Sequence, residues 1–228
     1  MRLAKVLGPA VIAALIATAL IGVNSGSAEP TELEKVVFCK KLQNPCEKDN
    51  HIAVDTKFHG ELNGGNVSVL LGRDETGEFQ ILCSESYFSG KVEGLLAEGV
   101  IEKLVLDECV NTRDGEECTI NTERLPYSFT GELELDHEHY ELLFTEGLEE
   151  APEFKVVCTS IGIDCKYSAG AFLFLQLHNL INNDAVFDIS QDINGLGSCL
   201  TTTWHAKYLT RCLNGQSQFV SCWLAMEK

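Results

Sequence analysis

Apolar and polar residues alternate along most of this chain with a period of two, the spacing of β-strands that bury one face. Val67, Val69 and Leu71 precede a turn-rich stretch, after which Phe79 and Ile81 resume the alternation. Turn residues between two alternating runs predict an antiparallel hairpin at this place.

Similar patterns recur toward the C-terminus. The phase of the alternation reverses across a polar tip between Phe129–Leu135 and Tyr140–Phe144, which predicts a second hairpin. The run Phe172–Leu180 is almost entirely apolar, so it predicts a central strand covered on both faces, with a short helix as the alternative. Further strands are predicted at Phe154–Cys158, Cys165–Tyr167, Trp204–Tyr208 and, after the Asn214-Gly215 turn, Phe219–Leu224.

Only Glu32–Leu42 and Val92–Leu104 favour helices, and both stretches are brief. Many short strands separated by turns predict an all-β fold, an antiparallel β-sandwich or barrel-like domain with at most short helices. We expect residues 29–228 to form a single β-rich domain, in which residues 29–55 are either integral or an appended N-terminal segment.

The first 28 residues have the pattern of a secretory signal peptide. Arg2 and Lys5 precede the apolar stretch Val6–Val23, and the small residues Gly26-Ser27-Ala28 form a cleavage pattern. The apolar stretch is short for a membrane span, which needs about 20 residues. We therefore expect secretion with cleavage after Ala28 and no stable membrane insertion afterwards; an uncleaved anchor is the alternative.

All 10 cysteines follow the predicted cleavage site, and an even number in an exported chain predicts disulfide bonds. Ten cysteines allow about 945 connectivities, nine times the 105 possible for eight, so the pairing stays open. Proximity in the sequence favours Cys39–Cys46, Cys109–Cys118, Cys158–Cys165 and Cys212–Cys222, which leaves Cys83–Cys199 as a long-range link.

The formal charge is −17, and loss of Arg2 and Lys5 with the leader would change it to −19. Nucleic acids and anionic membrane surfaces need a basic face, so they are disfavoured as partners. The acidity is explained either by the solubility of an exported protein or by a surface that binds cations or a cation-rich partner. No cofactor is indicated.

Candidate reactive residues are few. Asp136-His137-Glu138-His139 places two imidazoles two residues apart, but a solvated hairpin tip explains the segment better than a metal site. Asp188–Gly195 has acidic spacing, yet it puts Ser190 and Thr201 where a calcium loop needs carboxylates.

The remaining acidic and aromatic residues have structural interpretations. An exposed acidic loop is expected around Glu146, Glu149, Glu150 and Glu153. We expect Trp204 and Trp223 in the core.

The order of motifs resembles a broad family of uncharacterised exported proteins of high-GC Gram-positive bacteria, the actinobacteria, which carry a signal peptide and a cysteine-rich β domain. The resemblance implies a fold and no activity. It covers nearly the whole mature chain, whereas Cys212 and Cys222 lie beyond the usual pattern. The segments that carry it are Phe38-Cys39-Lys40, Pro45-Cys46, Ile81–Ser86, Phe88-Ser89-Gly90, Ile101–Leu106, Cys109, Cys118-Thr119-Ile120, Leu125-Pro126-Tyr127, Val157-Cys158, Cys165-Lys166-Tyr167, Cys199 and Trp204–Tyr208.

The sequence alone therefore favours a secreted, non-catalytic binding or structural protein whose partner is an extracellular ligand or envelope component. No catalytic residues and no metal ligands are assigned. Two alternatives remain: a secreted hydrolase that uses an Asp/Glu pair, and a carbohydrate-binding module that would expose Trp204, Tyr208 or Trp223.

The leader prediction is tested by N-terminal sequencing and intact mass of the exported product. We expect a chain that begins at Glu29, because the small-residue pattern ends at Ala28. A product that still begins at Met1 would contradict the prediction.

Overall fold

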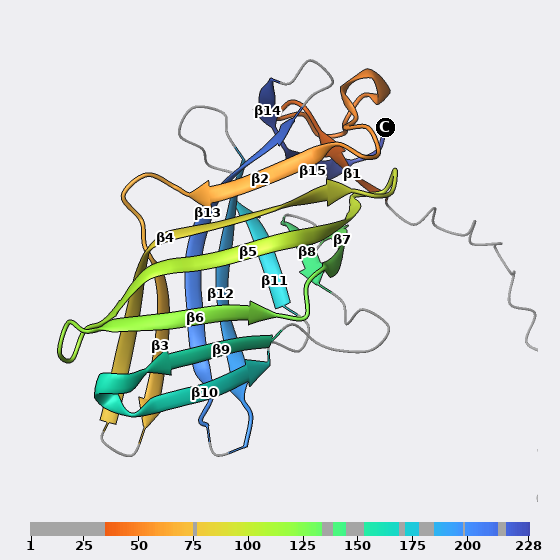
Figure 1. Ribbon diagram of the computed structural model, residues 1–228. Coiled ribbons are helices and arrows are strands. Elements are labelled where there is room, and N and C mark those ends of the chain that lie inside the picture. Colours follow the sequence, from red (N-terminus) through yellow and green to blue (C-terminus); the bar gives the residue numbers. More distant parts are fainter. Residues whose placement is uncertain are drawn as a thin grey trace, which may run out of the picture. The chain divides into compact units, whose positions relative to one another are not determined.

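The structure, a computed structural model, describes residues 35–74, 77–133, 139–144, 153–168, 172–177, 185–197, 199–213 and 218–228. Glu34–Lys228 is one compact unit. The described residues form antiparallel strands and two single-turn 3-10 helices, η1 (Lys48–Asn50) and η2 (Thr159–Ile161) (Figure 1). The strands are β1 (Val36–Cys39), β2 (Lys57–Leu62), β3 (Ser68–Asp74), β4 (Gly77–Val92), β5 (Glu98–Asn111), β6 (Glu117–Glu123), β7 (Tyr127–Leu133), β8 (Tyr140–Phe144), β9 (Glu153–Cys158), β10 (Ile163–Ser168), β11 (Phe172–Leu177), β12 (Ala185–Gly195), β13 (Thr202–Leu213), β14 (Phe219–Ser221) and β15 (Trp223–Met226).

The main sheet closes on itself twice. One closed ring follows the order β2–β4–β5–β7–β8–β11–β12–β13 and returns to β2; we call it the upper ring from its place in Figure 1. The lower ring follows β3–β4–β5–β6–β9–β10–β12–β13 and returns to β3. The long strands β4, β5, β12 and β13 belong to both rings, so each of them changes partner along its length.

The registers show where the partners change. Strand β4 pairs with β3 along Gly77–Cys83 and with β2 along Tyr87–Lys91. Strand β5 pairs with β7 along Glu98–Ile101 and with β6 between Leu106 and Val110. Each long strand therefore belongs to the upper ring along one part of its length and to the lower ring along another.

One aromatic core runs through both rings. The ring centroids of Phe88 in β4 and Tyr208 in β13 are 5.1 Å apart, and those of Phe174 in β11 and Trp204 are 6.3 Å apart. Trp204 also meets Phe154 of β9 in the lower ring, at 5.3 Å between ring centroids. Burial of each of these aromatic side chains contributes about 2–3 kcal/mol. Their continuous contacts join the upper and lower rings of strands into one folding unit.

Tyr208 and Trp204 have hydrogen-bond partners inside the core, whereas Thr210 Oγ1 and Trp223 Nε1 are buried without one among the described residues; an unpaired buried donor costs about 1–3 kcal/mol. The Tyr208 hydroxyl lies 2.6 Å from Ser86 Oγ, and Trp204 Nε1 donates to Ser68 Oγ at 2.8 Å. Complete burial raises the pKa of the Tyr208 hydroxyl, so that it remains neutral.

Strands β1 and β15 form a separate two-stranded sheet at one end of the upper ring. The buried side chain of Gln176 in β11 joins this pair to the main sheet. Its amide nitrogen donates to the Leu224 carbonyl at 3.0 Å, and its amide oxygen accepts from the Leu224 N–H at 2.5 Å. A side-chain amide thus replaces a backbone neighbour for β15.

The all-β fold class and the predicted hairpins are confirmed, but the predicted strand Phe219–Leu224 is divided into β14, which pairs with β13, and β15, which pairs with β1. Strands β3 and β4 pair through Leu70 and Ile81, and β7 pairs with β8. The apolar run at Phe172 forms the strand β11 between β8 and β12, not a helix. Residues 178–180 and the turn at 214–217 lie outside the described residues.

The two helix predictions are wrong within the described residues. Val36–Cys39 forms strand β1, because all four residues are buried against the core in pairing with β15. Val92–Leu104 joins the end of β4 to β5 through a turn. That turn and the exposed pair Glu102-Lys103 interrupt the alternation, which gives the apolar residues a spacing like that of a helix.

Segment 29–55 is integral to the domain from residue 35 onward, since β1 pairs with β15 and the Ile52 amide donates to the Phe38 carbonyl at 2.9 Å. The predicted leader lies outside the described residues. None of the helices among the described residues has the length and apolar character needed to cross a bilayer.

The structure pairs Cys39 with Cys46 and Cys212 with Cys222, as proximity suggested. The other three predicted pairs, Cys109–Cys118, Cys158–Cys165 and Cys83–Cys199, are wrong. The actual bonds are Cys83–Cys109, Cys118–Cys158 and Cys165–Cys199. The reason is the order of strands: β6 pairs with β9 across the sheet, and this brings Cys118 next to Cys158.

Replacing Gln176 by Ala tests the link to the terminal strands. We expect the free energy of unfolding to fall by about 3 kcal/mol, because the buried N–H and carbonyl of Leu224 lose their partners. Urea denaturation under oxidising conditions measures it. The half-buried Gln80 is the control, and Gln80→Ala should change stability by no more than about 0.5 kcal/mol. Equal losses in the two variants would contradict the assigned role of Gln176.

Candidate ligand-binding groove

The long strands β4 and β5 bend together where the two rings meet. In β4 the buried side chains switch from Ile81 and Cys83 to Ser86 and Phe88, so Ser84 and Glu85 are both exposed. The register with β5 is kept across the bend: Cys83 faces Cys109, and Glu85 faces Asp107.

Strand β5 makes the matching switch at Asp107 and Glu108, which are likewise both exposed. Relative to β6, this is a β-bulge, because Leu106 faces Ile120 whereas Cys109 faces Cys118. A bulge directs two successive side chains to one face of a sheet. The coupled bends therefore gather a hydroxyl and three carboxylates on the outer surface.

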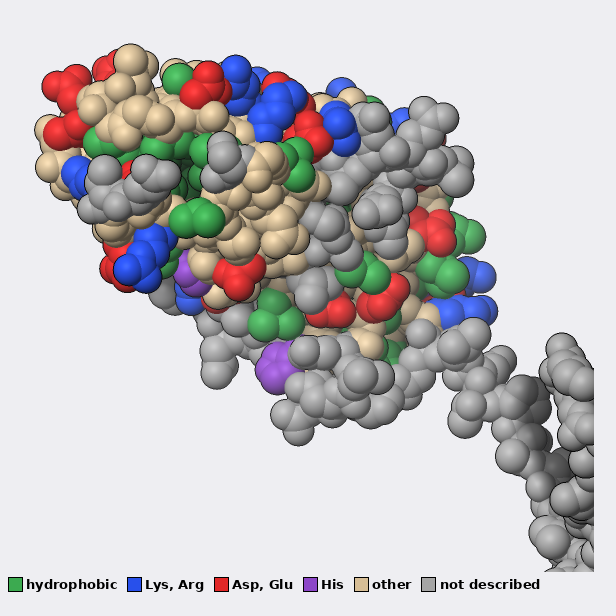
Figure 2. All heavy atoms as spheres, turned by 90° about the horizontal axis from the view of Figure 1, so that it is seen from below, with side chains coloured by type: hydrophobic (Ala, Val, Ile, Leu, Met, Phe, Trp, Pro, Cys, Tyr) green, Lys and Arg blue, Asp and Glu red, His purple; other side chains and the backbone are tan. Residues whose placement is uncertain are grey.

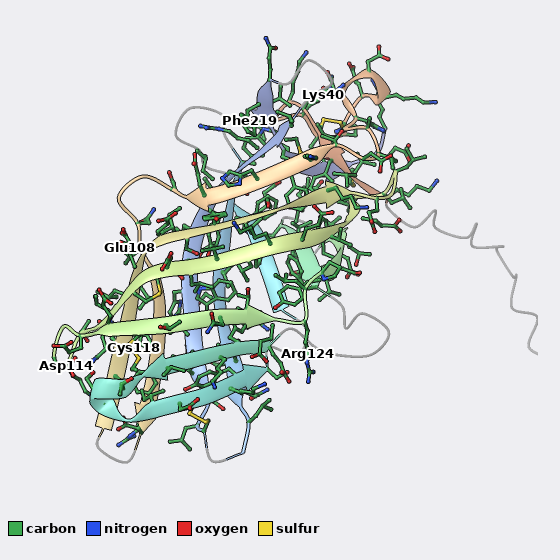
Figure 3. The ribbon with its side chains drawn as sticks, viewed as in Figure 1. Lys40, Glu108, Asp114, Cys118, Arg124 and Phe219 are labelled. Atoms are coloured by element: carbon green, nitrogen blue, oxygen red, sulfur yellow. A yellow bond between two sulfur atoms is a disulfide. The ribbon has the colours of Figure 1, made fainter. Side chains whose placement is uncertain are left out.

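Glu108 has a left-handed backbone conformation, with φ of 48°. A non-glycine residue in this region costs on the order of 1 kcal/mol, and such residues often occur at functional sites. Two hydrogen bonds hold it: Ser84 Oγ donates to Glu108 Oε2 at 2.6 Å, and the Glu108 N–H donates to Asp107 Oδ1 at 2.9 Å. Figure 3 shows Glu108 at the bend.

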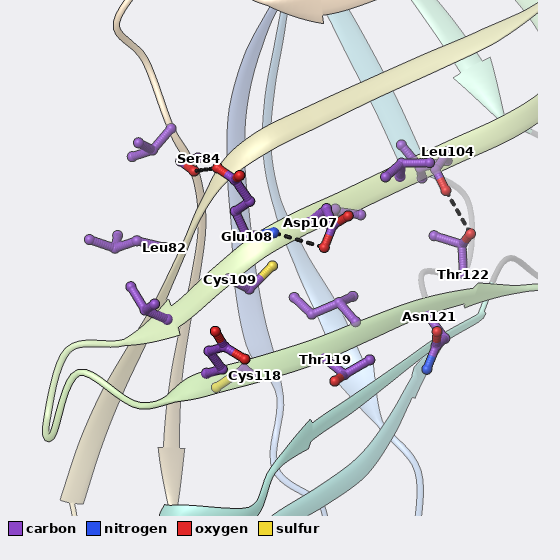
Figure 4. A pocket seen from close by; sticks show the side chains of 16 residues that line it. Leu82, Ser84, Leu104, Asp107, Glu108, Cys109, Cys118, Thr119, Asn121 and Thr122 are labelled. Carbon is purple, nitrogen blue, oxygen red and sulfur yellow. Dashed lines mark hydrogen bonds between the residues drawn. The ribbon is translucent and has the colours of Figure 1, made fainter.

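Beyond the bulge, β5 and β6 separate. Their pairing ends at Leu106, and β5 meets its next partner, β7, only at Ile101. Across the gap, the Thr122 hydroxyl donates to the Leu104 carbonyl at 2.7 Å. A groove of about 950 Å³ follows this stretch of the sheet (Figure 4).

The groove combines an apolar floor with a polar, acidic rim. Leu82, Val105 and Val110 supply its accessible apolar surface, whereas Leu104, Leu106 and Ile120 beneath it are at most 7% exposed. Thr119 and Asn121 lie on the β6 side. Its carboxylates are those of Asp107, Glu108 and Glu117, all exposed. No lysine or arginine is among the described residues that line it. This surface can bind a ligand with apolar and cationic or hydrogen-bonding groups.

Two ion pairs link the end of β6 and the turn that follows it to β9 and β10. Arg124 Nη2 lies 3.0 Å from Glu153 Oε1, and Lys166 Nζ lies 2.7 Å from Glu123 Oε2. The hydrogen bond between the last two raises the pKa of Lys166 and lowers that of Glu123. Glu153 is 5% exposed, so its expected place in an exposed acidic loop is wrong; it is a buried ion-pair partner.

The other acidic and histidine residues singled out from the sequence do not come together as a site. Asp188–Gly195 lies in the strand β12 and forms no loop. His139 directly precedes β8, whereas His137 and the acidic residues Glu146, Glu149 and Glu150 lie outside the described residues. Within the described ranges, no group of three or more His, Cys, Asp or Glu side chains could hold a metal ion.

Trp204, Trp223 and Tyr208 are at most 1% exposed, so none of them offers a flat stacking surface to a sugar. The sequence interpretation had missed the groove residues. A signal was present, since Ser84-Glu85 and Asp107-Glu108 each place two polar residues in succession within an otherwise alternating strand.

No family model, curated protein or solved structure matches this chain. The resemblance to exported actinobacterial proteins therefore stays a prediction.

Proposed function

We propose that this protein is a secreted, non-catalytic binding protein that acts outside the cell and holds its ligand in the groove between β5 and β6. The observation that carries the proposal is the groove itself: a hollow of about 950 Å³ at a bend where two shared strands change partners. The five disulfides and the predicted leader support an extracellular setting.

The disulfides also support binding by keeping the groove preorganised. Cys83–Cys109 joins β4 to β5 beside the bend, and Cys118–Cys158 joins β6 to β9 on the far side of the bulge. A rigid site loses less conformational entropy when a ligand binds. An extracellular ligand or an envelope component would therefore meet a preformed surface.

A secreted hydrolase is the alternative, because the groove does contain several carboxylates. The general acid of a glycosidase usually lies in apolar surroundings that favour its protonated form. Asp107, Glu108 and Glu117 are instead exposed to solvent, and the first two already accept hydrogen bonds from the bend. These features favour binding over acid–base chemistry.

Labelled protein spanning residues 29–228 can be tested on an array of peptides and oligosaccharides. We expect retention on some members, and we expect Thr119→Trp to abolish it, since Thr119 is an exposed side chain of the groove. Thr201→Trp, also exposed but outside the groove, is the matched control. Retention that Thr119→Trp leaves intact would contradict the proposed site.

The same preparations should not hydrolyse chromogenic glycosides or esters above the blank. Turnover that survives purification and disappears in Glu117→Gln would establish the hydrolase in place of the binding protein.

A further inference from the structure

A second hollow continues the groove across the sheet. It has a volume of about 490 Å³ and lies over β2 and β4, where His59, Glu61, Glu85 and Tyr87 are among its lining residues. Ser84 lines both hollows, so they meet at the bend. Together they extend over β2, β4, β5 and β6, which at ~4.8 Å per strand spacing is roughly 14 Å. About four residues of extended chain cover that distance.

The two hollows are acidic along their whole length. Asp107, Glu108 and Glu117 lie in the first hollow, and Glu61 and Glu85 in the second. Neither hollow has a lysine or arginine among its described lining residues. Of the cations nearby, Arg211 lies 3.5 Å from Glu61, and Lys103 donates to the Tyr87 hydroxyl at 2.6 Å.

The carboxylates at the meeting point repel one another. Glu85 and Asp107 are direct cross-strand partners, and like charges in that position destabilise a sheet. Within the described residues neither has a basic partner. In the neighbouring strands β9 and β10, by contrast, Glu153 forms an ion pair with Arg124, and Asp164 forms one with Lys155. Figure 2 likewise shows basic and acidic side chains interspersed over the described part of the lower face.

We propose that the two joined hollows bind an extended peptide segment in which basic and apolar residues alternate; this rests on the proposed binding function. Ammonium or guanidinium groups neutralise Glu85 and Asp107, where the carboxylates face each other without a cation. Apolar side chains lie against Val105, Val110 and Leu82, which line the first hollow. The ring of Tyr87, tilted by 41° against the ring of His59 at 5.7 Å between centroids, lines the second.

The probe is a fluorescein-labelled octapeptide of alternating Lys and Val, compared with the matching Glu and Val peptide. Fluorescence anisotropy with protein spanning residues 29–228 should show binding of the first and none of the second. The affinity should fall as NaCl is raised, since exposed charge pairs are screened by salt.

The decisive variant is Glu85→Gln/Asp107→Asn, which keeps the side-chain shapes. We expect it to weaken binding of the Lys and Val peptide about tenfold, or about 1.4 kcal/mol, since the peptide loses two exposed ion pairs. Glu98→Gln/Glu132→Gln removes two exposed carboxylates elsewhere and should leave the affinity unchanged. Thermal melting checks that both variants fold.

The outcomes separate the two proposals. Chitohexaose, an uncharged oligosaccharide of the array, is the second probe. If Thr119→Trp abolishes its binding while Glu85→Gln/Asp107→Asn leaves it intact, and the Lys and Val peptide does not bind, the groove stands and its cationic ligand is overturned. Equal weakening by the two double variants would likewise overturn the assignment to these carboxylates. If no probe responds to Thr119→Trp, the binding groove itself is contradicted.

Discussion

The shape of this protein depends on one constraint: four long strands must hydrogen-bond to different partners in two stacked rings. In β12 and β13 the buried side chains keep a single alternation along each strand, so these two strands change partners without a change of phase. In β4 and β5 the phase changes together at Ser84-Glu85 and Asp107-Glu108, and their mutual register is kept across this bend, although it shifts farther along, between Ser89 and Gly90. The surface features that matter for binding follow from this difference.

A strand that bends must expose residues that a straight strand would bury. At Ser84-Glu85 and Asp107-Glu108 the exposed residues are polar, so the bend costs little desolvation and the outer face becomes acidic. Where β5 then leaves β6 for β7, the sheet opens into the groove. Cys83–Cys109 and Cys118–Cys158 close loops spanning 26 and 40 residues in this part of the sheet. In the chain-entropy model, bridges over such lengths stabilise the folded state by about 3–4 kcal/mol each, because they lower the entropy of the unfolded chain.

The local patterns of the sequence predicted many of the strands but not β1 or the start of β5, where helices were expected, and not the rings. Alternation from Val67 to Ile81 predicted the hairpin of β3 and β4, although the residues that β3 buries are Ser68 and Leu70 and not Val67, Val69 and Leu71. The pairing of β6 with β9 depends on contacts between distant segments, and so does the bond of Cys118 to Cys158. The groove was missed for a related reason: the bulge at Asp107-Glu108 has meaning only beside β4 and β6.

The arrangement of strands behind the groove is tested most directly by a peptide map under non-reducing conditions. Cys83, Cys109, Cys118 and Cys158 lie in one row across β4, β5, β6 and β9. The structure predicts linked peptides that join Cys83 to Cys109 and Cys118 to Cys158. A bond between Cys109 and Cys118, or between Cys83 and Cys199, would contradict the arrangement of strands on which the groove and its proposed ligand depend.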